Sequence, residues 1–185
     1  LLAYWGVSKA RAVPVYGDLT SRKLGVGADD VKALKGQVDH LYHLAAVYDL
    51  SADEESQVKT NIEGTRSAVE FAKAIDTKHF HHVSSIAAAG MYEGVFREDM
   101  FEEAEGLDHP YFMTKHESEK IVRKECKVPW TVYRPAMVVG DSRTGEIRDM
   151  PPSSISCAPI ASTVTGLVRA TLGEIDRRPQ PIGGK

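Results

Sequence analysis

Tyr111 and Lys115 lie four residues apart in the stretch DHPYFMTKHESEK, which the sequence predicts to be helical. On a helix this spacing places a phenol and an ammonium on one face, one turn apart. Because a nearby ammonium favours phenolate over phenol, it lowers the tyrosine pKa from its unperturbed value of ~10. A tyrosine tuned in this way transfers a proton at a carbonyl or hydroxyl carbon. The alternative is a surface helix with one aromatic residue and scattered charges, since Tyr-x-x-x-Lys also occurs by accident.

Alternating strands and helices must position this pair. Short apolar runs predict strands at residues 12–16, 39–46, 79–85 and 130–134. Helical periodicity and the placement of prolines predict helices at residues 28–34, 52–75 and 110–127. This alternation predicts an α/β fold, a parallel sheet with helices on both faces. In such a sheet the functional residues lie at the carboxyl ends of the strands.

Small and polar side chains follow the predicted strands. Asp18 could accept a hydrogen bond from an adenine amino group, or it could cap a turn. A hydroxyl of the Ser84-Ser85 pair could donate to a substrate oxygen, or both serines could be ordinary turn residues. The small Ala45 and Ala46 would let a nucleotide lie close to the strand end, although simple packing explains them equally well.

Two residues of the predicted 52–75 helix are poor helix formers. Asn61 is unfavourable in a helix interior, so a buried role near the site is one explanation for it. Gly64 costs helix stability relative to alanine. The close approach of a neighbouring segment would explain this glycine, and so would a position on the surface.

Six motifs in the same order resemble those of the extended short-chain dehydrogenase/reductase family over roughly residues 13–140. They are VYGDL, VDHLYHLAAVYD, TNIEGTRSAVEFA, HHVSSIAAAG, YFMTK and VYRPAMVVGDSRTGE. Ala88 and Ala89 stand where the family usually has Val-Tyr. The DSRTGE ending and the HLAAVYDL segment are most similar to the branch of fatty acyl-CoA reductases and thioester reductases, the male sterility branch. That similarity implies an acyl thioester substrate.

The resemblance implies a Rossmann-type, doubly wound sheet and an NAD(P)-dependent oxidoreductase. Tyr111 would be the general acid/base, Lys115 would lower its pKa and hold the nicotinamide ribose, and Ser85 would bind the substrate oxygen. Asn61 would complete the catalytic set. The cofactor would be NADP or NAD, with NADP slightly favoured. The residues implied to bind it are Asp18, Leu19, Ala45, Ala46, Val47, Ser84, Tyr111, Lys115, Pro135, Ala136, Met137 and Val138.

Two other functions remain compatible with the same motifs. One is a sugar-nucleotide epimerase or dehydratase, which would use the nicotinamide transiently. The other is a non-catalytic binding protein that has kept the dinucleotide fold. Net consumption of cofactor separates the reductase from the epimerase.

The chain departs from the family pattern at its beginning. It shows no strand, glycine-rich turn and helix of the first βαβ unit, and Gly25-Val26-Gly27 is the only glycine pair nearby. Residues 1–150 are therefore expected to form a partial NAD(P)-binding domain, and residues 151–185 a tail without a recognisable substrate region. Because the glycine-rich turn normally holds the pyrophosphate, we expect the isolated polypeptide to bind cofactor weakly.

Composition argues against several other classes of protein. A net charge of −3 and the lack of a basic run interleaved with aromatics disfavour nucleic acid as a partner. No apolar stretch approaches the ~20 residues that span a bilayer. Two cysteines without zinc-type spacing predict a reduced, cytoplasmic protein without a metal site. The expected partner is a small-molecule substrate, and a homodimer is left open.

Overall fold

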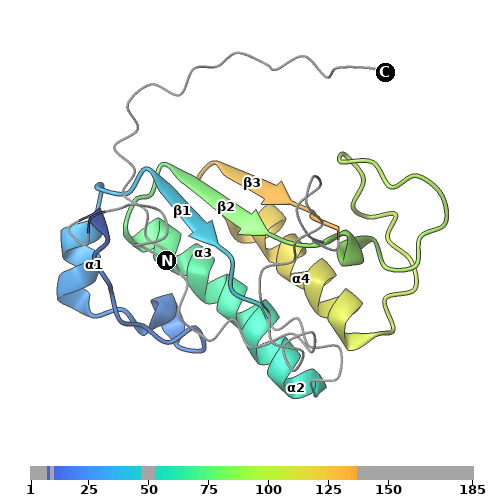
Figure 1. The fold of residues 1–185 in the computed structure, drawn as a ribbon, viewed down its shortest axis with the longest axis horizontal. Helices are drawn as coiled ribbons and strands as arrows, with labels where there is room; N and C mark the ends of the chain where they lie inside the picture. Colours follow the sequence, from blue (N-terminus) through green and yellow to red (C-terminus); the bar gives the residue numbers. More distant parts are fainter. Residues whose placement is uncertain (1–7, 9–10, 47–52, 137–185) are drawn as a thin grey trace, which may run out of the picture.

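The computed structural model describes residues 8, 11–46 and 53–136. Its sheet has three parallel strands in the order β1-β2-β3 (Figure 1). The strands are β1 (His40–His43), β2 (His79–Val83) and β3 (Trp130–Tyr133). In the register of the sheet, Leu41 pairs with Phe80, and Phe80 pairs with Trp130. The predicted α/β architecture with a parallel sheet is confirmed.

Helical segments connect successive strands, as parallel pairing requires. A short 3₁₀ helix, η2 (Arg22–Gly25), and α1 (Ala28–Leu34) precede β1. The connection from β1 to β2 contains α2 (Glu54–Gln57), the π-helix η3 (Val58–Glu63) and α3 (Gly64–Ala74). The connection from β2 to β3 contains the 3₁₀ turn η4 (Ile86–Ala89) and α4 (Pro110–Glu125).

Local sequence signals set the ends of the two long helical segments. The side chain of Asp53 accepts a hydrogen bond from the Ser56 amide at 2.8 Å, which caps the start of α2. At α4 the Pro110 ring occupies the first turn, where its missing amide hydrogen costs nothing. The predicted helices at 52–75 and 110–127 are therefore confirmed to within two residues at each end.

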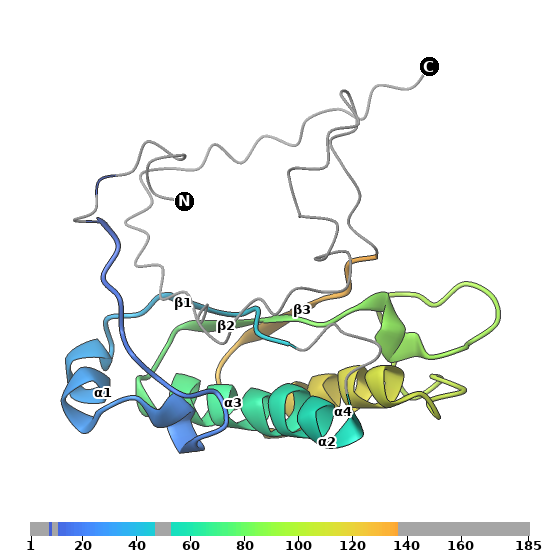
Figure 2. The ribbon, with the colours of Figure 1, turned by 60° about the horizontal axis from the view of Figure 1, so that its bottom comes forward.

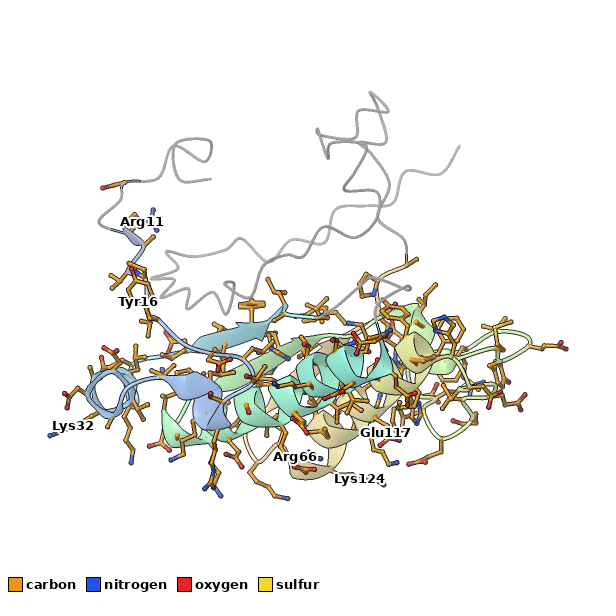
Figure 3. All side chains as sticks on the ribbon, turned by 90° about the horizontal axis from the view of Figure 1, so that it is seen from below. Arg11, Tyr16, Lys32, Arg66, Glu117 and Lys124 are labelled. Carbon is orange, nitrogen blue, oxygen red and sulfur yellow. The ribbon has the colours of Figure 1, made fainter. Side chains whose placement is uncertain are left out.

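The apolar core lies between the sheet and helices α3 and α4, which pack on the same face (Figure 2). Leu41 of β1 and Phe80 of β2 are fully buried there, against Phe71 of α3 and Val122 of α4. Figure 3 shows Arg66, Glu117 and Lys124 on the outer side of these two helices, away from the sheet. The amphipathic pattern of the helices thus places their apolar side against the strands.

The opposite face of the sheet is covered by no helix of the described residues (Figure 2). It carries a row of histidine and tyrosine side chains centred on His81. The ring nitrogens of His81 lie 2.9 Å from His40 Nδ1 and 3.0 Å from the Tyr133 hydroxyl. Helices were expected on both faces of the sheet. Within the described residues they lie on one face.

The predicted strand at residues 12–16 is wrong, because no residue of this segment belongs to a strand. Val13 and Tyr16 are 75% and 88% exposed. A strand needs a hydrogen-bonded neighbour, and none of the described residues pairs with this segment. The tail from residue 137 onward lies outside the described residues.

The described residues contain neither a membrane-spanning helix nor a cluster of metal-binding side chains. None of their helices is both long enough and apolar enough to cross a membrane. Among the same residues, no group of three or more His, Cys, Asp or Glu side chains is placed to hold a metal ion.

Candidate active site

Tyr111 and Lys115 lie one turn apart on α4, as their spacing predicts. The Lys115 ammonium lies 6.0 Å from the centre of the Tyr111 ring. Lys115 is only 1% exposed, and this burial lowers its pKa to about 8. Tyr111 is half-buried. The pair therefore combines a buried amine with a half-buried tyrosine.

Asn61, in the π-helix η3, contacts the helix that carries this pair. A π-helix is a local widening of a helix, with i→i+5 hydrogen bonds, that often occurs at functional sites. Asn61 is 2% exposed, and its Nδ2 donates a hydrogen bond of 3.1 Å to Thr114 Oγ1. Thr114 stands immediately before Lys115 on α4, and its hydroxyl lies 3.2 Å from the Tyr111 carbonyl. Asn61 is therefore buried and bonded to α4, and its role in the site stays a prediction.

A further hydrogen bond ties Asn61 to the end of β1. Thr65 Oγ1 donates to the Asn61 carbonyl at 2.6 Å. Because this bond uses the only hydroxyl hydrogen of Thr65, His43 Nε2 must be the donor to Thr65 Oγ1 at 3.0 Å. Burial, reinforced by the charge of Lys115, lowers the pKa of His43 to about 3, so its ring is neutral. This chain of contacts connects β1, η3 and α4.

We expect Thr65→Val to loosen this connection. The substitution removes the hydroxyl that serves both Asn61 and His43, and it leaves the buried His43 N–H unsatisfied, at a cost of about 1–3 kcal/mol. Turnover should fall along with the free energy of unfolding, measured by chemical denaturation.

Thr77→Val is the matched control. The Thr77 hydroxyl is also buried and donates to the Val38 carbonyl at 3.1 Å, at the opposite end of the strands. This control should lose stability and keep its turnover. Equal turnover in the two variants would contradict a role for Thr65 in the site.

Ser84 and Ser85 follow β2 and lie beside the end of β3. The Ser84 amide donates to the Tyr133 carbonyl at 2.8 Å, and the Ile86 amide donates to the Pro135 carbonyl at 3.2 Å. Ser85 is half-buried, and its hydroxyl oxygen accepts a hydrogen bond from the Ala87 amide at 3.1 Å. Ser84 is 1% exposed, and within the described residues its hydroxyl has no hydrogen-bond partner.

Asp18 and Leu19 lie in the turn before η2. The Asp18 carboxylate accepts hydrogen bonds from the Thr20 amide at 2.9 Å and from the hydroxyls of Thr20 and Ser21 at 2.8 Å. The bond from the Thr20 amide and the two hydroxyl bonds lower the pKa of Asp18. The turn-capping alternative is therefore observed for Asp18, and its contact with adenine stays a prediction.

Gly64 is explained by its neighbour Leu19. A Cβ atom on Gly64 would lie 2.9 Å from Leu19 Cγ, closer than ordinary packing allows. The predicted close approach at this glycine is confirmed. It fixes Leu19, one of the expected cofactor-binding residues, against the helical segment that carries Asn61.

The remaining expected cofactor residues follow β1 and β3. Ala45 and Ala46 are half-buried directly after β1, while Pro135 and Ala136 are exposed after β3. Val47, Met137 and Val138 lie outside the described residues. The contact of these small residues with a dinucleotide stays a prediction.

Glu119, which is fully buried on α4, was not predicted from the sequence. Its carboxylate is held by Arg134 from the end of β3 at 2.6 Å and by Arg123 from α4 at 2.8 Å. Burial alone would raise the pKa of Glu119, but the hydrogen bonds and charges of both arginines outweigh it and lower the pKa. The ion pairs fasten the end of β3 to α4. The sequence did hold one signal for this residue: Glu119 is a charged residue four positions after Lys115, and therefore on the same face of the helix.

The chain is similar to several known proteins. The male sterility protein family of NAD-binding domains matches residues 3–175. A linear gramicidin synthase of Brevibacillus parabrevis is 34% identical over 153 residues, which are 78% of this chain and 3% of that protein. The fatty acyl-CoA reductase wat of Drosophila melanogaster is 25% identical over 194 residues, 89% of this chain and 37% of that protein.

A solved structure is similar as well. The crystal structure of the terminal R domain from the myxalamid PKS-NRPS biosynthetic pathway superposes with a TM-score of 0.62 at 31% identity, covering 71% of this chain and 34% of the other. The chain thus spans well under half the length of each of these relatives. The family match over most of the chain, the sheet and the order of the motifs agree: the chain belongs to the male sterility protein family, a fatty acyl-CoA reductase-like branch of the extended short-chain dehydrogenases/reductases, and carries part of its Rossmann-type domain.

Proposed function

We propose that this protein reduces an acyl thioester with a nicotinamide cofactor, and that Tyr111 supplies the proton. The observation that carries the proposal is the arrangement on α4, where a buried lysine amine lies 6.0 Å from the ring of a half-buried tyrosine. The family match and the similarity to a fatty acyl-CoA reductase support a reductase over the other two functions.

Each residue has a defined part in this reaction. The cofactor, when bound, supplies the hydride and is itself oxidised by two electrons. Ser85 donates a hydrogen bond to the thioester carbonyl oxygen, and Tyr111 gives that oxygen a proton as the carbonyl carbon accepts the hydride. The resulting tetrahedral hemithioacetal then breaks its C–S bond, which releases aldehyde and thiol. Lys115 stabilises the phenolate that Tyr111 leaves behind.

Asn61 acts on the position of Tyr111 and Lys115. Its amide bonds Thr114, which lies between them on the helix, at 3.1 Å. A fixed helix face keeps the proton donor within reach of the substrate oxygen, and such positioning contributes a large part of enzymatic rate enhancement. The same bond holds the π-turn of η3 against α4.

An assay with an acyl-CoA and either NADPH or NADH tests the proposal. We expect net oxidation of the reduced nicotinamide, measured by absorbance, together with an aldehyde that can be trapped as its hydrazone. A UDP-sugar serves as the comparison substrate. Isomerisation of the UDP-sugar without net loss of cofactor, and no turnover of the thioester, would contradict the reductase and favour the epimerase.

The choice of cofactor and the assembly remain predictions at this site. We expect a lower KM for NADPH than for NADH, measured in the same assay. A cytoplasmic location stays a prediction from the sequence, and a homodimer stays an open possibility.

A further inference from the structure

His116, the residue after Lys115, contacts the turn that carries Ser85. Its ring is 7% exposed, and its Nδ1 donates a hydrogen bond of 3.0 Å to the Ala88 carbonyl in η4. A carbonyl only accepts, so the hydrogen must lie on Nδ1 of His116. The helix that bears Tyr111 and Lys115 therefore also binds the turn that follows Ser85.

The turn itself is tightly built. The Ser85 carbonyl accepts from the Ala88 amide at 3.1 Å, and the Ala87 carbonyl accepts from the Gly90 amide at 3.0 Å. Gly90 has a φ of +64°, and a Cβ atom there would overlap the Glu105 carbonyl. Since Ser85 begins this turn and caps it through its side chain, movement of Ala88 would carry Ser85 with it.

The His116 ring is itself held in one orientation. Phe101 stacks on it with ring centres 4.3 Å apart and ring planes 5° from parallel. The Arg123 guanidinium lies 4.6 Å from the centre of the Phe101 ring. Arg123 in turn binds the buried Glu119 at 2.8 Å. Stacking on Phe101 and attachment to α4 thus fix the orientation of the His116 ring, whose Nδ1 donates to Ala88.

We propose that His116 is a positioning residue for Ser85, setting the distance between its hydroxyl and the phenol of Tyr111. This inference rests on the proposed function and adds to it the contact that places the substrate-oxygen donor. Catalytic groups must be held within about 0.5 Å of the productive geometry, and a single hydrogen bond to the following turn controls movement on that scale.

Two substitutions separate the parts of the contact. His116→Phe keeps a ring for Phe101 and removes the donor to Ala88. His116→Asn keeps a donor close to the position of Nδ1 and loses the stacked ring. We expect His116→Phe to lower kcat by about 10- to 100-fold with little change in the KM for cofactor, and His116→Asn to restore most of kcat. A lower kcat in His116→Asn than in His116→Phe would overturn the proposal.

A double-mutant cycle with Ser85→Ala tests whether the effect passes through Ser85. In the Ser85→Ala background, His116→Phe should change kcat by less than about threefold, because the group it positions is gone. The same fold-loss in both backgrounds would overturn the proposal.

Amide hydrogen exchange gives a readout that needs no substrate. His116→Phe should speed exchange at the amides of Ala88 and Gly90, and His116→Asn should not. If the protein reduces no thioester, the proposed function fails while this measurement still tests the contact. Unchanged exchange in His116→Phe would overturn the positioning role even in an active enzyme.

Discussion

Replacing Tyr111 with phenylalanine is expected to lower the rate of thioester reduction by about 10²- to 10⁴-fold, the usual contribution of a positioned proton donor. The ring, its half-buried position and its place in the first turns of α4 are retained, so the fold should be unchanged. The KM for cofactor should change little, because the loss falls on a group that acts in the transition state. Steady-state kinetics and a thermal unfolding scan of the same preparation check both expectations.

Tyr92→Phe is the control for this substitution. Tyr92 lies in the segment between η4 and α4, where its ring meets Phe96 edge-on with ring centres 5.4 Å apart. Loss of this phenol should leave the rate within about twofold of the original, as expected for a substitution away from a functional group. A Tyr111→Phe enzyme with an unchanged rate would remove Tyr111 from the mechanism.

Lys115→Met is expected to separate activity from stability. Methionine approximates the length of the lysine side chain without its charge, so turnover should fall by about 10²-fold or more as stabilisation of the phenolate is lost. The folded protein should become more stable at neutral pH, because the ammonium at this site is almost fully removed from water. Lys120→Met, on the same helix but paired with Glu117 at 2.8 Å in a more exposed position, should change stability by less than about 1 kcal/mol.

The pH dependence of stability tests the same burial. The pKa of Lys115 is about 8 in the folded protein, against an ordinary value of 10.5. Between these values the unfolded chain binds more protons, so the free energy of unfolding should rise with pH, by about 3 kcal/mol in total. Denaturation of the original protein and of Lys115→Met across this range isolates the effect of Lys115. Parallel curves for the two proteins would show that Lys115 does not titrate in this range.

Elements with strong local signals were predicted well. Pro110 and Pro129 delimit α4, and the apolar periodicity of residues 52–75 predicted the long segment from α2 to α3. The strand predicted at residues 12–16 was wrong because an apolar run indicates strand propensity alone, and a strand also needs a paired neighbour. The π-turn of η3 was not predicted, since apolar periodicity does not distinguish i→i+5 bonding from an ordinary helix.

The sequence by itself determined the order of the elements and the placing of Tyr111 and Lys115 on one helix face, because helical periodicity is a local property of the chain. Only the tertiary structure decided which residues contact the helix that carries this pair. Asn61, His116 and Glu119 find Thr114, Ala88 and Arg134 across separations of 53, 28 and 15 residues. Such contacts depend on how the helices pack beneath the sheet, where a buried polar group must find a partner, and residue spacing does not specify that packing.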